Sequence, residues 1–171
     1  MTSAIQPPRI FTIGYEGASA EAFLTTLKTA RIARVLDVRE LPLSRRRGFS
    51  KGALSATLEH AGIAYQHERR LGAPRVIRHR LREDHDLARY FEDFREYLTT
   101  QRDLLDALVK TLTGAVALLC YERNPAECHR SAVASALAAR LKIRVENLHV
   151  HEPQQAPRAA CARPRQGLSA T

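Results

Sequence analysis

A run of six residues, Ala115 to Cys120, is apolar throughout, as a central strand buried on both faces of a parallel sheet has to be. Other short apolar runs alternate along the chain with longer amphipathic segments. Because parallel strands are joined by crossover helices, this alternation predicts an α/β fold. We expect a three-layer, Rossmann-like domain with a mainly parallel sheet of about five strands flanked by helices.

The strands and helices of this domain can be placed from the periodicity of the apolar residues. Strands are predicted at Arg9–Ile13, Val35–Val38, Ile63–His67, Ala115–Cys120 and Arg144–Val150. Helices are predicted at 19–28, 50–61, 86–112 with a break near Thr99, and 129–141, with Ser19 and Ser50 as capping residues. Residues 68–84 hold proline, glycine and many arginines without a clear period, which predicts a long surface excursion and a candidate lid. A single domain then covers 9–150, between flexible tails at 1–8 and 151–171.

Charge and cysteine content narrow the partners and the compartment. The formal net charge is +9, and much of the positive charge is arginine, which binds phosphate or carboxylate through two parallel hydrogen bonds. We therefore expect an anionic small molecule or nucleic acid as the partner; the alternative is a basic surface without a ligand. The three cysteines lack a disulfide spacing, and no apolar stretch is long enough to span a bilayer. These features predict a cytoplasmic protein that does not bind membranes, and they indicate no particular protein partner.

The residue types that carry chemistry follow the predicted strands. In an open parallel sheet, ligands bind beyond the carboxyl ends of the strands, near helix N-termini whose free amides attract anions. Such residues occur in four segments: Gly14–Gly17, Asp37–Arg46, Tyr65–Glu68 and Cys120–Ser131. We therefore expect these four segments to build one ligand site at one edge of the sheet.

The segment CYERNPAECHRS holds the candidate nucleophile. If Cys128, His129 and Arg130 open a helix, the positive helix end and the cationic neighbours lower the pKa of the Cys128 thiol and make its thiolate available. His129 is then the candidate general acid or base. The alternative for Cys128 is a small buried hydrophobe, and packing is the favoured interpretation of Cys120, which ends an apolar strand.

A metal site is a second alternative for this segment, which holds four residues of metal-ligating types: Cys120, Glu122, Cys128 and His129. The spacing fits zinc poorly, because the adjacent side chains of Cys128 and His129 should diverge at a helix start. We therefore expect no metal and no other cofactor. Glu122 is assigned a catalytic role in holding His129 or an arginine, with a solvated surface carboxylate as the alternative. Arg130 and Ser131 suit an oxyanion.

Carboxylates also follow the first two strands. Glu16 stands between two glycines in a tight turn, where it can act as a general base or bind a ribose hydroxyl. The alternative for Glu16 is an ordinary turn residue. Asp37 and Arg39 alternate with Val38, so both can lie on one face as a buried ion pair that orients the following loop. We favour this ion pair over direct catalysis.

Cationic and aromatic side chains complete the predicted site. Arginines at 45–47, with Lys51 near a helix start, form a phosphate-contacting cluster or, in the alternative, a solvated basic loop. Tyr65 and His67 share one side of a strand, so both can reach the ligand, although His67 also fits a structural role. The arginines of 69–82 suit a groove along nucleic acid, but few aromatic residues stand nearby to stack bases.

Four ordered motifs carry a resemblance to a known family: FTIGYEG, VLDVRELPLSRRRGFSK, GIAYQHERRLG and LLCYERNPAECHRSAVASAL. Over residues 10–150 the chain resembles the domain of unknown function 488. The resemblance implies an α/β, Rossmann-like domain and no settled activity. It also implies a pocket built from Gly14, Tyr15, Glu16, Asp37, Arg39, Ser44, Arg45, Tyr65, His67, Cys120, Glu122, Cys128, His129 and Arg130. One departure is LGAP at 71–74, where the family often has a second glycine after LG.

Two functional hypotheses of different classes follow. In the first, the chain is an enzyme, a hydrolase or transferase acting on a phosphate-bearing nucleotide or nucleic-acid component. In the second, it is a noncatalytic nucleic-acid or nucleotide-binding module in which arginines give salt-dependent affinity and cysteines only pack. We favour the enzyme, because a binding surface has no need to gather cysteine, histidine and carboxylate at strand ends. The enzyme predicts a deep pocket, and the module predicts a shallow basic groove.

Overall fold

The sheet in the computed structural model, which describes residues 6–152, has five strands, all parallel. The strands are β1 (Arg9–Gly14), β2 (Arg34–Asp37), β3 (Ala64–His67), β4 (Ala115–Cys120) and β5 (Val145–Leu148). They lie in the order β3-β2-β4-β1-β5. The predicted α/β fold class is therefore confirmed. The tails predicted at 1–8 and 151–171 fall largely outside the described residues, as does Cys161.

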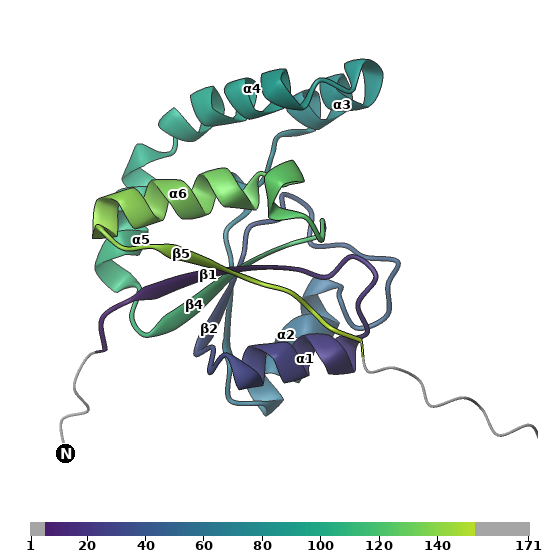
Figure 1. Cartoon of the computed structure of the whole chain (residues 1–171), viewed down its shortest axis with the longest axis vertical. Coiled ribbons are helices and arrows are strands. Elements are labelled where there is room, and N and C mark those ends of the chain that lie inside the picture. Colours follow the sequence, from purple (N-terminus) through teal and green to yellow (C-terminus); the bar gives the residue numbers. More distant parts are fainter. Residues whose placement is uncertain (1–5, 153–171) are drawn as a thin grey trace, which may run out of the picture.

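Within the described residues, six helices flank the sheet. They are α1 (Ala20–Thr29), α2 (Lys51–His60), α3 (Arg75–Asp84), α4 (Leu87–Thr99), α5 (Arg102–Thr111) and α6 (Arg130–Leu141). Two short 3-10 turns, η1 (Arg69–Leu71) and η2 (Pro125–Glu127), lie between longer elements. Figure 1 shows α1 and α2 below the sheet and α4 and α6 above it, which gives the three layers. Helix α5 packs through Leu105 and Leu108 into the same core cluster as α4 and α6. Within residues 6–152, none of the helices is both long and apolar enough to cross a membrane.

The central strand β4 divides the core in two. Its side chains alternate between the faces: Val116, Leu118 and Cys120 belong to the cluster under α4, α5 and α6, whereas Ala117 and Leu119 belong to the cluster over α1 and α2. All six residues of β4 are buried, as the apolar run predicted. Cys120 therefore emerges from the sheet on the side of α6.

The helix starts agree only in part with the predicted capping residues. Ser19 caps α1, because its hydroxyl accepts a hydrogen bond from the Ala22 amide at 3.1 Å. Ser50 precedes α2 but makes no side-chain cap; its hydroxyl donates instead to the Ser44 carbonyl at 3.1 Å. The Ser50 hydroxyl thus closes the arginine-rich loop and leaves the helix start without a side-chain cap.

The prediction of an irregular excursion at 68–84 was wrong, because η1 and α3 occupy most of it. Helix α3 buries only Ile77 and holds few apolar residues among many charged ones, so it lacks the apolar residues on which the prediction depended. The helical segment predicted at 86–112 is confirmed together with its break near Thr99, because α4 ends at Thr99 and α5 begins at Arg102. Gly72, in the LGAP segment, is required by close approach, since a Cβ there would lie 2.1 Å from the Glu40 amide nitrogen.

Strand register brings the predicted site segments to one edge of the sheet. Gly14 pairs with Cys120 between β1 and β4, and Asp37 pairs with His67 between β2 and β3. Asp37 also pairs with Leu119, next to Cys120, on the other side. The loops that follow these strands therefore start side by side, as the sequence predicted.

Candidate functional site

A cavity of about 710 Å³ lies at this edge. Seven of the predicted site residues line it: Tyr15, Arg39, Ser44, Arg45, Cys120, Glu122 and His129. The other predicted residues do not line it: Gly14, Glu16, Asp37, Tyr65, His67, Cys128, Arg130 and Ser131. The contacts of these residues, described below, show that several of them support the loops around the cavity.

Asp37 and Arg39 form the buried ion pair that the alternation around Val38 predicted. Arg39 Nη2 lies 2.5 Å from Asp37 Oδ2, and Arg39 Nε donates to Asp37 Oδ1 at 2.8 Å. Arg39 Nη1 donates to the Tyr15 hydroxyl at 3.0 Å and to the Phe49 carbonyl at 2.8 Å. Burial lowers the pKa of Arg39, but the carboxylate of Asp37 outweighs it, and the pKa lies above its ordinary value. Four of the five N–H donors of the guanidinium are therefore used within the fold.

Tyr65 and His67 support this ion pair from β3. The Tyr65 hydroxyl donates to Asp37 Oδ2 at 2.7 Å, and burial together with that carboxylate raises the pKa of Tyr65. His67 Nε2 lies 2.8 Å from the Arg39 carbonyl oxygen, which can only accept, so this nitrogen is the donor. Both side chains behave as structural partners of the ion pair.

Arg130 holds the loop after β4. It is fully buried, and its Nη atoms donate to the carbonyls of Glu122 and Arg123. The predicted anion-binding role of Arg130 therefore needs correction, because burial and these bonds keep its Nη atoms from a ligand. Gly14 makes room for the same loop, since a Cβ there would lie 1.8 Å from the Glu122 carbonyl oxygen.

Glu16 and Ser131 also hold the chain in place. The Glu16 carboxylate accepts from the Arg123 amide at 3.0 Å, and its carbonyl accepts from the Arg123 guanidinium at 3.3 Å. Glu16 is exposed and lies outside the cavity lining. The Ser131 hydroxyl donates to the Cys128 carbonyl at 2.9 Å. In this geometry Glu16 is a turn residue that clamps the neighbouring loop, which agrees with the alternative interpretation.

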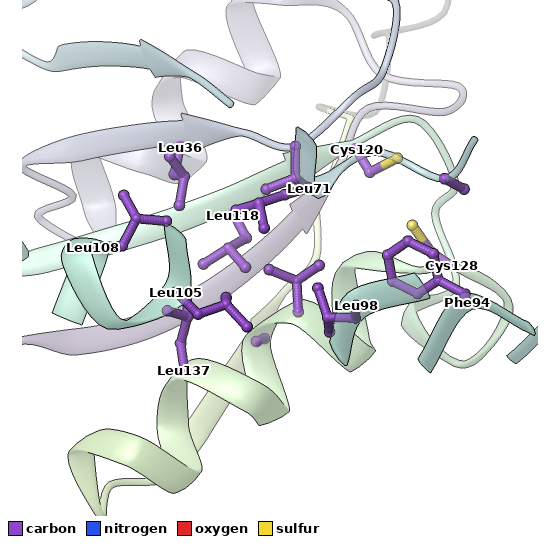
Figure 2. Packing of buried hydrophobic residues seen from close by; sticks show 14 of the residues in the cluster. Leu36, Leu71, Phe94, Leu98, Leu105, Leu108, Leu118, Cys120, Cys128 and Leu137 are labelled. Atoms are coloured by element: carbon purple, nitrogen blue, oxygen red, sulfur yellow. The ribbon is translucent and has the colours of Figure 1, made fainter. Parts of the chain in front are cut away.

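A thiol, a carboxylate and an imidazole share the wall of the cavity nearest α6. The Cys120 thiol donates to Glu122 Oε2 at 3.2 Å and lies 3.9 Å from His129 Nδ1. The His129 ring is oriented by two contacts: Nε2 donates to the Val38 carbonyl at 2.9 Å, and the ring meets Phe94 edge-on. Figure 2 shows the sulfur atoms of Cys120 and Cys128 at the Phe94 end of the core cluster.

The ionisable groups on this wall affect one another. Burial raises the pKa of Glu122, but hydrogen bonds from the Cys128 and Cys120 thiols outweigh it, and the pKa lies below its ordinary value. Burial lowers the pKa of His129, but the contact with Cys128 and the Val38 carbonyl raise it above its ordinary value. At neutral pH this arrangement keeps Glu122 ionised.

The prediction of a lowered Cys128 pKa was wrong. Cys128 is fully buried, and burial together with the neighbouring Cys120 raises its pKa well above the ordinary value. The helix predicted at 129–141 is confirmed within one residue, because α6 begins at Arg130 with His129 as its N-cap, and Cys128 lies between η2 and this helix. Burial nevertheless removes the Cys128 thiol from the solvent.

The expectation that Cys128 and His129 diverge was wrong as well. The ligand atoms of Cys120, Cys128 and His129 all lie within 4.8 Å of one another, and all three residues are buried. Sequence spacing could not reveal this, because the η2 turn before α6 directs the two adjacent side chains toward the same strand end. The structure thus gathers two sulfur donors and one nitrogen donor.

The rim of the cavity is cationic. Arg78 pairs with Glu40, and Arg46 Nη1 donates to the Ala18 carbonyl at 2.6 Å. Arg45 and Arg82 line the cavity, are exposed, and make no ion pair within residues 6–152. The Ser44 hydroxyl accepts from the Arg46 amide at 3.1 Å. The two free guanidinium groups are therefore the side chains best placed to meet an anion.

Several lining residues were missed by the sequence reasoning: Glu40, Leu41, Leu43, Ala73, Leu81, Tyr90, Tyr121 and Glu127. Leu41, Leu43 and Tyr121 are 52%, 76% and 46% exposed. Two leucines within an otherwise polar loop are a signal that could have been followed, because large apolar side chains in a loop either pack or bind. Arg78 and Arg82 belong to the arginines of 69–82 that were expected along a nucleic-acid groove, but helix α3, which brings these two to the cavity, was not predicted.

The chain was also compared with known proteins. The family model described as "Domain of unknown function DUF488" matches residues 19–137, which is more than half of the chain. No curated protein and no solved structure matches the chain.

Proposed function

This chain belongs to the DUF488 family, which is defined only as a domain of unknown function, and we propose from its own geometry that it is an enzyme acting on a nucleotide or nucleic-acid component. The observation that carries the proposal is that one cavity combines free arginines, exposed apolar side chains and a thiol–carboxylate–imidazole wall. A phosphate, a base and a reacting bond are the three parts of a nucleotide that such groups would contact.

The rim supports binding of the phosphate. Arg45 and Arg82 stand on different elements, the loop after β2 and helix α3, and both face the cavity. A phosphate between them would accept charge-assisted hydrogen bonds from each guanidinium. The third nearby cation, Arg78, is already neutralised by Glu40.

The mouth of the cavity supports binding of a planar apolar group. Leu41, Leu43 and Tyr121 line it, and they are three of the five exposed large hydrophobic residues within 6–152. Apolar side chains that gather beside a cationic rim commonly mark a ligand site. A nucleobase would cover part of this surface and stack on the Tyr121 ring.

The wall supports acid–base chemistry through Glu122 and His129. An ionised Glu122 can accept a proton from a water molecule or from a hydroxyl group of the substrate. The oxygen that loses this proton then attacks the reacting bond. His129, when protonated, can stabilise the negative charge that develops. Burial and the charge of Glu122 raise the pKa of Tyr90, which lines the same cavity and remains a hydrogen-bond donor at neutral pH. We assign no nucleophilic role to Cys128, because its thiol is fully buried.

Ligand binding is tested by calorimetric titration of the reduced chain with ribonucleoside monophosphates, and with the matching nucleosides as probes lacking phosphate. We expect the monophosphate to bind more tightly, and Arg45→Ala or Arg82→Ala to weaken binding about tenfold or more, the effect of losing one charged hydrogen bond. Arg144→Ala is the matched control, since Arg144 is exposed, immediately precedes β5 and does not line the cavity.

Catalysis is tested by following the same nucleotides chromatographically with the wild type and with Glu122→Gln. We expect turnover to fall by about 10²-fold or more in Glu122→Gln, the usual contribution of a general base, while nucleotide binding persists. Nucleotide binding by the wild type without any turnover would favour the noncatalytic module, in which the arginines alone matter. Equal affinity for monophosphate and nucleoside would contradict the proposed phosphate site.

A further inference from the structure

In and behind the cavity wall beside α6 lie two cysteine sulfurs and one histidine nitrogen that can still act as metal ligands. We propose that Cys120, Cys128 and His129 form a binding site for one divalent transition-metal ion of the zinc type, with its open coordination position toward the cavity. The site is inferred from its own donor atoms and goes beyond the proposed function, since the ion can bind whether or not a nucleotide does.

The donor set and its spacing match such an ion. Zinc prefers sulfur and nitrogen ligands at about 2.3 Å and 2.0–2.1 Å, which puts the donors of one tetrahedral ion about 3.5–3.8 Å apart. The three donor atoms lie within 4.8 Å of one another, and Cys120 Sγ is 3.9 Å from His129 Nδ1. Small side-chain rotations would therefore close the three donors around one ion.

His129 has its outer partner already in place. Its Nε2–H donates to the Val38 carbonyl at 2.9 Å, which fixes the ring and leaves Nδ1 as the nitrogen available for a metal. Metal-ligating histidines usually donate their other ring nitrogen to a carbonyl or carboxylate in this way. The edge-on contact with Phe94 further restricts the imidazole ring.

The backbone holds the three ligands on rigid elements. Cys120 ends the central strand β4, and Cys128 and His129 lie between the η2 turn and helix α6. The loop between these two segments is fastened by the buried Arg130 through the carbonyls of Glu122 and Arg123. A donor set fixed in this way loses little conformational freedom when the ion binds.

The position relative to the cavity indicates an open site. Cys120 and His129 line the cavity, whereas Cys128 is fully buried behind it. Three protein ligands with one position open to a cavity are typical of catalytic zinc, and four protein ligands of structural zinc. Glu122, whose Oε2 is 3.2 Å from Cys120 Sγ, lies beside the open position.

Metal binding would also change the protonation of the cluster. Burial raises the pKa of Cys128, so this thiol is protonated without an ion. Each coordinating thiol transfers its proton to the buffer as its sulfur lone pair binds the metal, and no oxidant or reductant is needed. Binding is therefore expected to weaken as pH falls.

The test titrates Co²⁺ into the reduced, metal-free full chain and records the visible and near-ultraviolet spectrum. We expect one equivalent to produce thiolate-to-cobalt charge-transfer bands with tetrahedral d–d bands, and Zn²⁺ to abolish both. Cys120→Ser and Cys128→Ser should each reduce the charge-transfer intensity by about half, in proportion to the sulfur donors. Cys161→Ser and His79→Ala are the matched controls and should leave the spectrum unchanged.

X-ray absorption of the zinc-loaded wild type provides a measurement that requires no variant to fold. We expect two sulfur scatterers near 2.3 Å and nitrogen or oxygen scatterers near 2.0 Å. A folded, fully reduced wild type without charge-transfer bands would overturn the proposal. So would bands that persist in folded Cys120→Ser and Cys128→Ser, or a zinc shell without sulfur. Because these readouts use the metal alone, they fail or succeed independently of nucleotide binding.

Discussion

The two sides of the cavity use their polar residues in opposite ways. On the β2 side, Asp37, Tyr15 and the Phe49 carbonyl accept hydrogen bonds from four of the five N–H donors of Arg39. On the β4–α6 side, the Cys120 sulfur and His129 Nδ1 lie close together beside the cavity and can still bind a ligand. A saturated network stabilises a scaffold, whereas unsaturated groups are available for a ligand.

This difference teaches how to interpret clustered charged residues. Both sides contain residue types associated with catalysis. Their hydrogen-bond partners show which side chains hold the fold together and which are available to react. Variants on the β2 side should therefore change the free energy of unfolding, and variants on the β4–α6 side should change chemistry. The predictions below follow this comparison from the largest expected effect on stability to the smallest.

Breaking the Asp37–Arg39 pair should have the largest effect. Asp37→Ala leaves the buried Arg39 guanidinium without its counter-charge, which costs about 3–5 kcal/mol for a buried pair. Chemical denaturation monitored by circular dichroism measures this loss. A loss below about 1 kcal/mol, the size seen for surface pairs, would contradict the assignment of this side as scaffold.

Gly14→Ala should be the next largest. The added Cβ would overlap the Glu122 carbonyl, so the loop after β4 must shift, at a cost of about 1–3 kcal/mol for overpacking. Gly52→Ala is the matched control, because nothing lies within 4 Å of a Cβ there and the position is helical. The control should be neutral or stabilising by up to about 1 kcal/mol. Equal destabilisation of the two variants would show that the loop does not approach Gly14 closely.

Glu122 should make stability depend on acidic pH. Its pKa is lowered in the folded state, so it stabilises the fold above its ordinary value of about 4.5, and this contribution disappears as pH falls through the lowered pKa. Glu122→Gln should therefore flatten the acid limb of the stability–pH profile. Parallel profiles for wild type and variant would show that Glu122 titrates as in the unfolded chain.

His129 should act with the opposite sign. Its pKa is raised in the folded state, so its contribution is complete below about 6.5 and is lost as pH rises through the raised pKa. His129→Gln should remove this loss, and denaturation measured from pH 5 to 9 checks it. A loss of stability that persists unchanged in the variant would assign the effect to another group.

Arg45→Ala and Arg82→Ala should change stability least. Both side chains are exposed and unpaired within residues 6–152, so we expect shifts within about 0.5 kcal/mol. Thermal denaturation measures this alongside nucleotide binding. A loss above about 1 kcal/mol would place these arginines in the scaffold and remove the contrast between the two sides.

The fold was largely predictable because apolar periodicity follows directly from burial. The run at 115–120 predicted β4 and its burial, and the alternation predicted the parallel sheet. Helix α3 escaped because it buries only Ile77 and presents charge on its other sides. Apolar residues are the main sequence signal for a packed helix, so a helix with few apolar residues is difficult to predict from the sequence.

The site was predictable as a place but not as a set of roles. The convergence of four segments follows from strand polarity, which any parallel sheet imposes. The direction of a side chain after a strand depends on the path of the loop, and this path is set by distant contacts. Arg130 was expected to bind an anion but fastens its own loop, and Cys128 was expected to be a reactive thiol but is fully buried in the core cluster. Residue type alone carried none of this information.

The most direct test of the contrast between the two sides is a crystal structure of Glu122→Gln with a bound nucleoside monophosphate. The account predicts the phosphate between Arg45 and Arg82, the base against Leu43 or Tyr121, and Arg39 still bound to Asp37. A nucleotide bound through Arg39, or bound outside this cavity, would contradict it.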